Sequence, residues 1–547
     1  MTPWQRLLGL VKLEKKDIYQ VFNYAIFSGL VALSLPLGIQ AIVNLIQGAQ
    51  ISTSWIVLVI LVTIGVIFSG ILQLMQLKII ESIQQRIFMR ASFELSYRFP
   101  KIKFEELRNY YPPELANRFF DTITIQKGLA KILIDIPTAL LQIVFALILL
   151  SFYHPFFILF GLLVLALVFM VFKYTAKQGL MTSLKESKYK YRVAHWIQEI
   201  ARSVISFKLS GRTNLAVEKN DSLVVNYLEA RQKHFGVLML QFIQMIGFKV
   251  IITAGLLIVG GFLVINQEMN IGQFVAAEII ILIVIASVEK LILSLEPFYD
   301  VLTAIEKLGQ VVDKDLENQH GNQPNFIKDF NVELQNVGYS VEDREMPILL
   351  DISLKINSKS RILIQGETGS GKSSLLSLIS GVIKPTKGHL FINGLSSESI
   401  LINHYRAHLG LSINEEAPFE GTIRENISFG DKTISDEDIL WAMEKANLSD
   451  FLKVQPKGLS TKLYPEGKRI SYTVSKKIIL ARAIVKKPKL LILEDALDQF
   501  NIQETNTIID FLTDKSNPWG VIVISNNKYW TQKCTEVKIL SNGKITN

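Results

Sequence analysis

One short run of this sequence has residue types and spacing that suit phosphate chemistry. Residues 366–373 read GETGSGKS and match the pattern G-x-x-x-x-G-K-[ST]. In this pattern the glycines let backbone N–H groups converge on phosphate oxygens, the lysine ammonium reaches the terminal phosphates, and the hydroxyl enters a Mg²⁺ shell. We therefore predict a site for a nucleoside triphosphate with Mg²⁺. Its candidate residues are Gly366, Glu367, Thr368, Gly369, Ser370, Gly371, Lys372, Ser373 and Ser374.

The segments on either side of this run have the patterns of a strand and a helix. Residues 361–365 (RILIQ) form an apolar run typical of a buried strand, and residues 374–379 (SLLSLI) favour a helix. A helix that begins directly after the loop points the positive end of its dipole at a bound anion. Because a chance match to the pattern rarely has both flanks, we expect the loop to bind a nucleotide.

The composition indicates a membrane protein. The chain has 547 residues, 49% of them hydrophobic, and a mean hydropathy of +0.30. The formal charge of +9 would suit a nucleic-acid partner, but no basic patch interleaved with aromatic residues supports one. We expect no nucleic acid and assign the excess of Lys and Arg to cytoplasmic loops. The single cysteine, Cys534, excludes an internal disulfide framework and a multi-cysteine metal site.

Six apolar runs are each close to the ~20 residues that cross a bilayer. They lie at about 21–46, 55–77, 132–153, 156–173, 237–265 and 273–297. The connections 47–54, 154–155 and 266–272 are short and contain no Lys or Arg, whereas 78–131 and 174–236 are long and rich in both. Buried helices of a soluble protein do not produce this alternation. The positive-inside rule predicts a multi-pass protein of the inner (cytoplasmic) membrane with both termini cytoplasmic.

The two long polar stretches keep a helical period, so we expect the spanning helices to extend beyond the bilayer. Each stretch contains one break, at 110–113 (YYPP) and at 209–212 (LSGR). Proline pairs and Ser-Gly interrupt helices, and the tips of two hairpins are therefore expected at these breaks.

The ends of the membrane region have their own patterns. Residues 1–20 mix apolar and basic side chains and lack the compact apolar core of a cleavable signal peptide. They predict a helix at the membrane surface in contact with lipid, with an ordinary surface helix as the alternative. From residue 331 onward strands alternate with helices. We predict a transmembrane domain at 1–312, a linker at 313–330 and an α/β domain at 331–547.

Two ionisable residues lie inside the last two spans. Lys249 and Glu289 are each 16 residues from the outer end of their span, which is ~24 Å at 1.5 Å per residue. Equal depth on antiparallel neighbours predicts an ion pair. Glu278 is shallower and is expected to face a central cavity instead. The alternative is that Lys249 extends to the interface while Glu289 pairs with Lys290 or water.

Six spans with two long hairpins, followed by a P-loop domain, resemble one half of an ATP-binding cassette (ABC) exporter. Residues 35–40 (LPLGIQ) are similar to a stretch of type I secretion exporters. The resemblance implies a multidomain fold, in which an all-α transmembrane domain of six helices precedes a P-loop α/β nucleotide-binding domain, with ATP and Mg²⁺ as cofactors. It implies a homodimer or a heterodimer with another half-transporter, and it admits a periplasmic adaptor protein. It also places the tips that dock on the ATPase domains at 114–121 and 210–217.

The resemblance assigns roles at positions where this chain carries unusual residues. Val341 stands at the place of an adenine-stacking tyrosine, with Tyr339 nearby as a substitute. Asn414 stands at the metal-sensing loop glutamine, upstream of the well-matched 421–427 (GTIRENI). In the signature loop, 470–474 (ISYTV), only Ser471 is kept, and Tyr and Thr replace two glycines. A backbone without these glycines cannot approach a phosphate as closely.

The acidic and switch positions are altered as well. Glu494 and Asp495 stand in the reverse of the family's order, so each carboxylate lies about one C–C bond from its expected place. Asn526 stands at the switch histidine, and an amide cannot take up a proton near pH 7 as imidazole can. The implied metal ligands are Ser373, Asn414 and Glu494, and the implied catalytic residues are Asp495 and Asn526.

Two functions fit these observations. The first is the ATP-binding subunit of an exporter that moves a peptide, protein, lipid or other amphipathic substrate out of the cytoplasm, with weakened or absent hydrolysis. The second is a non-transporting, ATP-responsive regulatory or scaffold subunit of a secretion assembly. The kept P-loop and hairpins favour the first. Phosphoryl transfer depends on positioning and electrostatics, so five altered positions leave open whether the chain is an active ATPase.

Overall fold

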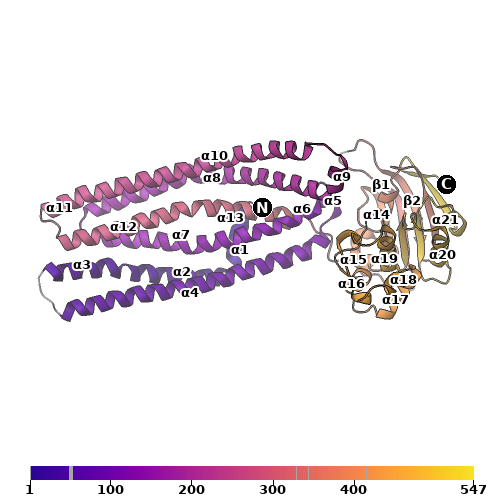
Figure 1. The fold of residues 1–547 in the computed structure, drawn as a ribbon, viewed down its shortest axis with the longest axis horizontal. Helices are drawn as coiled ribbons and strands as arrows, with labels where there is room; N and C mark the ends of the chain where they lie inside the picture. The colour runs from indigo at the N-terminus through magenta and orange to yellow at the C-terminus, as the bar shows by residue number, and fades with distance from the viewer. Residues whose placement is uncertain (1, 48–52, 328, 343, 414–415, 547) are drawn as a thin grey trace. The chain divides into compact units, whose positions relative to one another are not determined.

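The computed structural model describes residues 2–47, 53–327, 329–342, 344–413 and 416–546 (Figure 1). The chain divides into two units by its internal contacts. The first comprises Met1–Pro100 and Asn109–Lys314, and the second comprises Lys101–Arg108 and Asp315–Asn547. The second unit therefore includes a short piece of the first hairpin as well as the C-terminal part of the chain.

The first unit is helical, and Figure 1 shows its long helices side by side. Two of them, α4 (Thr53–Arg98, 46 residues) and α8 (Phe156–Arg202, 47 residues), are about 70 Å long at 1.5 Å per residue. This is more than twice the ~30 Å apolar thickness of a bilayer, and it confirms that the spanning helices extend beyond it. Among the described residues, six helical segments are long and apolar enough to cross a membrane: Lys15–Gln47, Thr53–Lys101, Pro112–Ser151, Phe156–Arg202, Leu215–Ile265 and Ile271–Val312. The protein is a multi-pass membrane protein.

The other helices of this unit begin and end where the sequence supplies breaks. Pro36 lies in the first turn of α3, and Pro297 lies in the first turn of α13, where a missing N–H is tolerated. The remaining bounds are α1 (Pro3–Leu13), α2 (Lys15–Ala32), α3 (Ser34–Gln47), α6 (Pro112–Ala116), η2 (Asn117–Phe120), α7 (Asp121–Ser151), α9 (Val204–Leu209), α10 (Leu215–Gly255), η3 (Leu256–Gly260), α11 (Gly261–Ile265), α12 (Ile271–Leu293) and α13 (Leu295–Val312).

Both predicted hairpin breaks are present. α6 begins at Pro112, and α9 ends at Leu209 before the left-handed Gly211. The segment 114–121 lies in the first unit, whereas Lys101–Arg108 belongs to the second. There Ile102 forms an antiparallel bridge with Leu316. The proline pair marks a break, but backbone pairing ten residues upstream decides which residues join the cassette. Both docking segments, 114–121 and 210–217, stay predictions.

The second unit contains a mostly parallel sheet of six strands in the order β12-β11-β3-β10-β9-β6 and an antiparallel sheet in the order β2-β1-β4-β5. In the first sheet β10 lies between β3 and β9 and is parallel to both. The strands are β1 (Asn331–Tyr339), β2 (Leu349–Asn357), β3 (Arg361–Gln365), β4 (Lys387–Ile392), β5 (Leu395–Ser396), β6 (Leu409–Ser412), β7 (Gly421–Thr422), β8 (Lys462–Leu463), β9 (Leu490–Glu494), β10 (Gly520–Ile524), β11 (Glu536–Ser541) and β12 (Lys544–Thr546).

The central strands are apolar throughout because both of their faces are buried. Ile362 and Ile364 of β3 pack in one hydrophobic cluster, and Leu363 between them packs in another. Successive side chains of a strand point to opposite faces of the sheet, so one strand contributes residues to both hydrophobic clusters. The helices of this unit are α5 (Phe104–Leu107), α14 (Lys372–Ile379), α15 (Ile402–Arg406), α16 (Ile423–Ser428), α17 (Asp436–Lys445), α18 (Ser449–Lys453), α19 (Tyr472–Ile484), α20 (Ile502–Thr513) and α21 (Lys528–Lys533), with short turns η4 (Ser397–Ser399), η5 (Gly458–Ser460) and η6 (Pro465–Gly467).

The predicted ion pair between the last two spans is present. Lys249 Nζ on α10 lies 2.6 Å from Glu289 Oε2 on α12. Lys290 pairs with Asp135 on α7 at 3.0 Å. The expectation of equal depth is therefore confirmed, and the alternative in which Glu289 pairs with Lys290 is wrong. Adjacent residues of α12 contact two different helices, which fixes its rotation between them.

Exchanging the charges of this pair tests its contribution. We expect Lys249→Glu to reduce the yield of folded protein, because two carboxylates would then face each other in place of the ion pair, and Glu289→Lys added to it to recover part of the loss. The measurement is the monodisperse fraction after extraction from the membrane. Exchange of Asp135 and Lys290 is the matched control pair. A double variant no better than the worse single one would contradict the coupling.

Candidate nucleotide-binding site

The loop 366–371 connects β3 to α14 and needs glycine at two places. Gly366 has φ +154°, and a Cβ there would lie 2.1 Å from the Leu540 carbonyl oxygen. Gly371 has φ +101° and is the residue that precedes the first turn of α14. Side chains rarely adopt this conformation, so the glycines shape a loop whose N–H groups and helix N-terminus can surround phosphate.

The charged and hydroxyl side chains of the loop have defined contacts. Lys372 Nζ donates to the carbonyl oxygens of Gly366 at 2.9 Å and Glu367 at 2.8 Å, so the ammonium lies over the loop. The Ser373 hydroxyl donates to Glu494 at the end of β9. Ser370 is buried, and Ser374 is half-buried on the first turn of α14. The structure thus joins the loop and the acidic strand end.

The Ser373 hydroxyl and the Glu494 carboxylate suit Mg²⁺. Both supply hard oxygen atoms, and Mg²⁺ at a nucleotide site commonly takes one or two protein oxygens and completes its shell with phosphates and water. Asn414, the third predicted ligand, lies outside the described residues. The two described residues would hold the ion, which would neutralise charge on the terminal phosphates.

Asp495 is in an unusual conformation and electrostatic environment. Its φ is +44°, and its N–H donates to the Ile524 carbonyl of β10 at 2.9 Å. Burial and the neighbouring Asp498 and Glu494 carboxylates raise the pKa of Asp495 to about 6. A carboxylate with this pKa can accept a proton near neutrality. Asn526, two residues beyond Ile524, is exposed at the same edge of the sheet.

Ser471 contacts its own helix. Its Oγ accepts from the Val474 N–H at 3.2 Å, which caps the N-terminus of α19. Tyr472 follows in the first helical turn and is about half exposed. The loop that resembles the signature therefore ends in an ordinary serine-capped helix in this unit.

Tyr339 is buried and is not exposed as a stacking ring. It is 7% exposed and belongs to a hydrophobic core cluster, as does Val341. A cavity of about 300 Å³ lies next to the loop, and its wall includes Arg344 and Met346 between β1 and β2, together with residues 367–370 and 541–543. These two residues were missed, because irregular loop residues have no periodicity that marks them.

A buried lysine near the acidic strand end was also missed. Lys476 on α19 is 3% exposed, and its Nζ donates to the Ile413 carbonyl at 3.5 Å. Burial lowers the pKa of Lys476, opposed by the negative charges of Glu416, Glu494 and Asp495. Burial raises the pKa of Glu416 to about 7, opposed by Arg482 and Lys476. Lys476 lies five residues after Ser471, and no sequence pattern predicts that it interacts with these carboxylates.

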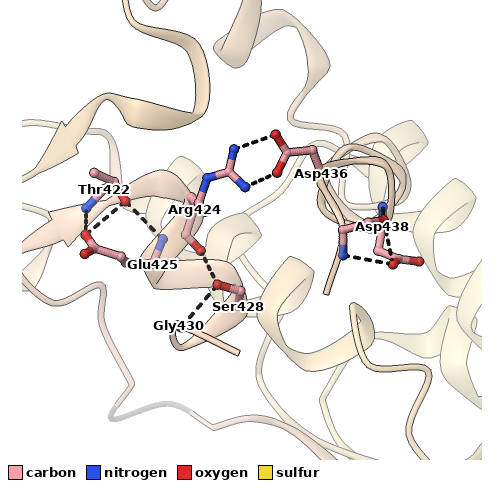
Figure 2. A network of polar contacts seen from close by, with 8 residues as sticks. Thr422, Arg424, Glu425, Ser428, Gly430, Asp436 and Asp438 are labelled. Atoms are coloured by element: carbon pink, nitrogen blue, oxygen red, sulfur yellow. Dashed lines mark hydrogen bonds and ion pairs between the residues drawn. The ribbon is translucent and has the colours of Figure 1, made fainter. Parts of the chain in front are cut away.

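Hydrogen bonds fix the segment between Glu416 and α17. Figure 2 shows Thr422 and Glu425 capping α16 reciprocally, while the Arg424 guanidinium makes two contacts with Asp436. On the other side, Arg482 Nε donates to the Asn426 carbonyl at 2.7 Å. α16 is thereby held against α19.

Comparisons with known proteins agree with the two units. Residues 20–288 match the ABC transporter transmembrane region, and residues 349–498 match the ABC transporter domain. The chain belongs to the ABC transporter family. A solved structure of a bacterial Atm1-family ABC exporter with ATP bound superimposes with a TM-score of 0.87 and covers 98% of this chain and 95% of that chain. At 16% identity this likeness shows the shared fold.

Curated relatives match over shorter regions. A Staphylococcus aureus (strain NCTC 8325) ATP-binding/permease protein, named for multidrug export, is 28% identical over 233 residues, which is 43% of this chain and 40% of that protein. An ABC-type transporter of Curvularia clavata is 30% identical over 217 residues, which is 39% of this chain and 16% of that protein. The matched regions thus cover less than half of these relatives.

Replacing Lys372 in this half-transporter should weaken ATP binding. Lys372→Ala removes a charge-assisted contact to phosphate, so we expect a loss of about one to a few kcal/mol. Titration of the full-length protein with fluorescent ATP measures it. Lys359→Ala, an exposed lysine of the same unit, is the control. Unchanged affinity of the Lys372 variant would refute the assignment of the loop.

Proposed function

We propose that this chain is the ATP-binding subunit of an exporter that moves a peptide, protein, lipid or other amphipathic substrate out of the cytoplasm, with hydrolysis slowed or absent. The observation that carries the proposal is the contact of Ser373 with Glu494 beneath a loop that keeps its glycines and lysine. These groups supply most of the contacts that hold Mg²⁺ and the phosphates. Binding is therefore expected to survive where turnover does not.

The groups that would activate water are the altered ones. Asp495 has a side chain one methylene shorter than glutamate, starts from a backbone with φ +44°, and shares its surroundings with Asp498 and Glu494. Asn526 cannot take up a proton. An ångström-scale displacement of a reacting group can cost ~10²-fold in rate, so several displacements together bring hydrolysis close to background.

The proposed setting is the inner membrane, with both termini and the cassette in the cytoplasm. The six spans and the basic character of the long hairpins support this orientation. Two half-transporters, identical or different, would place two cassettes together around ATP. A homodimer would then carry the altered acidic and signature positions in both sites. A periplasmic adaptor remains part of the proposal for a secretion exporter.

A second candidate is an ATP-responsive regulatory or scaffold subunit. It is favoured by one observation, the placement of buried Lys476 among the charges of Glu416, Glu494 and Asp495. A fixed cation at this edge offsets carboxylate charge that Mg²⁺ and proton transfer would otherwise use. ATP turnover of the purified protein in lipid separates the candidates, because slow but measurable turnover, below ~1 s⁻¹, supports the exporter, whereas binding without any turnover supports the regulator.

Arg344 is expected to contact the base of ATP. Arg344 lines the cavity beside residues 367–370, and a guanidinium stacks well on an aromatic face. We expect Arg344→Ala to weaken ATP binding roughly 2- to 5-fold, the range of an exposed cation–π contact, without changing competition by inorganic triphosphate. Lys372→Ala should weaken both ligands. Equal losses for both ligands in Arg344→Ala would show that the residue does not read the base.

Restoring the altered positions should raise turnover only when they are restored together. The variant carries Glu494→Asp, Asp495→Glu, Asn526→His, Tyr472→Gly and Thr473→Gly. Residues that act as a unit are non-additive, so single changes should do little. The measurement is phosphate release in lipid, and the same variant with Lys372→Ala is the background control. Turnover of ~1 s⁻¹ or faster by the unmodified protein would contradict the proposal of slowed hydrolysis.

A further inference from the structure

The first unit contains a basic cavity that the nucleotide site does not use. Its volume is about 600 Å³, and it lies between α6, η2, α8, α10 and α13. Its lining includes five Lys and Arg side chains and two glutamates, besides His195: Arg118, Lys188, Arg192, Lys219 and Lys307 against Glu114 and Glu199. The excess of positive charge converges from four elements and selects for an anion.

The inner wall of the cavity is built from buried cations. Arg118 is 7% exposed and Lys307 is 8% exposed. The Arg118 guanidinium stacks 3.6 Å from the centre of the Tyr191 ring, and the Lys307 ammonium lies 5.4 Å from the same centre. The Tyr191 hydroxyl donates to Asp121, which holds the ring in place. The ring thus fixes two positive charges at one end of the cavity.

The carboxylates nearby leave part of this positive charge without hydrogen bonds. Arg118 Nη2 donates to Glu114 Oε1 at 3.2 Å, and Glu114 also contacts His195. Among the described residues, Arg118 Nε and Nη1 have no hydrogen-bond partner. These two atoms are closed off from solvent, so an anion in the cavity would stabilise the buried Arg118 cation through its charge rather than by contacting them. The same arrangement would be unfavourable for a neutral or cationic ligand.

The position of the cavity along α8 distinguishes between a lipid headgroup and a soluble molecule as the source of the anion. Tyr191 is 35 residues beyond Phe156 on the continuous helix α8, which is about 52 Å at 1.5 Å per residue. The apolar core of a bilayer accounts for ~30 Å of this length. The cavity therefore lies roughly 20 Å beyond the apolar core in the proposed orientation, farther than a lipid headgroup reaches, and open to soluble molecules.

We propose that this cavity binds a soluble anion carrying two or more phosphate groups, with Arg118 and Lys307 at its inner end and Arg192 and Lys219 at its rim. Guanidinium groups match phosphate oxygens in pairs, and ammonium groups add point charge. A volume of about 600 Å³ admits a ligand of the size of a nucleoside diphosphate. Because Lys307 lies on α13, which leads into the cassette, the ligand bridges that helix to α8 and α10.

The test measures binding of inorganic pyrophosphate to the full-length chain carrying Lys372→Ala, so that the P-loop contributes little. Calorimetry in phosphatidylcholine nanodiscs should detect binding that weakens with added salt. Lys307→Met keeps the apolar packing of the stem and should reduce affinity at least 10-fold. Arg192→Ala with Lys219→Ala, both exposed, should reduce it about 3- to 10-fold and flatten the salt dependence. Lys185→Ala, an exposed lysine on α8 outside the cavity, should change nothing.

Three results would overturn the proposal. One is absence of pyrophosphate binding. Another is equal affinity in the Lys307, rim and Lys185 variants, which would place the anion elsewhere. The third is loss of pyrophosphate binding when phosphatidylglycerol is added to the nanodiscs, because a lipid headgroup would then be the occupant. Retained binding in anionic nanodiscs, together with the loss in Lys307→Met, would support a soluble phosphate ligand.

Discussion

The contact between the Ser373 hydroxyl and the Glu494 carboxylate depends on the parallel register of three strands. β3 and β9 lie on either side of β10, and Ile524 of β10 is in register with both Ile364 and Glu494. The carboxyl ends of the three strands therefore lie at one edge of the sheet. The loop follows β3, the pair Glu494 and Asp495 lies at the end of β9, and Asn526 follows β10. Changing the register of any one strand by a residue would exchange the side chains that it presents to the two hydrophobic cores. The site exists because two hydrophobic cores hold this register.

The groups that bind phosphate are positioned mainly by the backbone, whereas the groups that would activate water are positioned by the length of single side chains. Phosphate binding depends on the backbone, on φ angles that only glycine adopts easily, and on a lysine that reaches the loop by a flexible stem. Activation of water depends on the reach of single side chains, where one methylene changes a position by more than an ångström. A chain can thus keep the first while the second changes, as Glu494 and Asp495 illustrate.

Much of the fold could be predicted because it follows from local patterns. The strand, loop and helix around 366–373 follow from an apolar run and glycine spacing, and the Lys249–Glu289 pair follows from equal helical rise in two spans. What could not be predicted depends on contacts between distant segments. Tyr339 is buried by β-sheet packing, Lys101–Arg108 joins the second unit through a bridge to Leu316, and the buried Lys476 of α19 interacts with the charges of Glu416, Glu494 and Asp495.

The helix α19 links two groups of altered residues within one chain. Its N-terminus carries Ser471, followed by Tyr472 and Thr473, the two residues that stand at glycine positions of the family's signature loop. Lys476 lies little more than one turn later, among the charges of Glu416, Glu494 and Asp495. A change in the position of that N-terminus therefore moves a buried cation relative to the carboxylates that would hold Mg²⁺. Electrostatic interactions at this depth are weakly screened, so a small shift has a large effect. Under the proposed function, the predicted signature and acidic positions would act on one electrostatic cluster, which would be a physical reason for their altered residues to occur together.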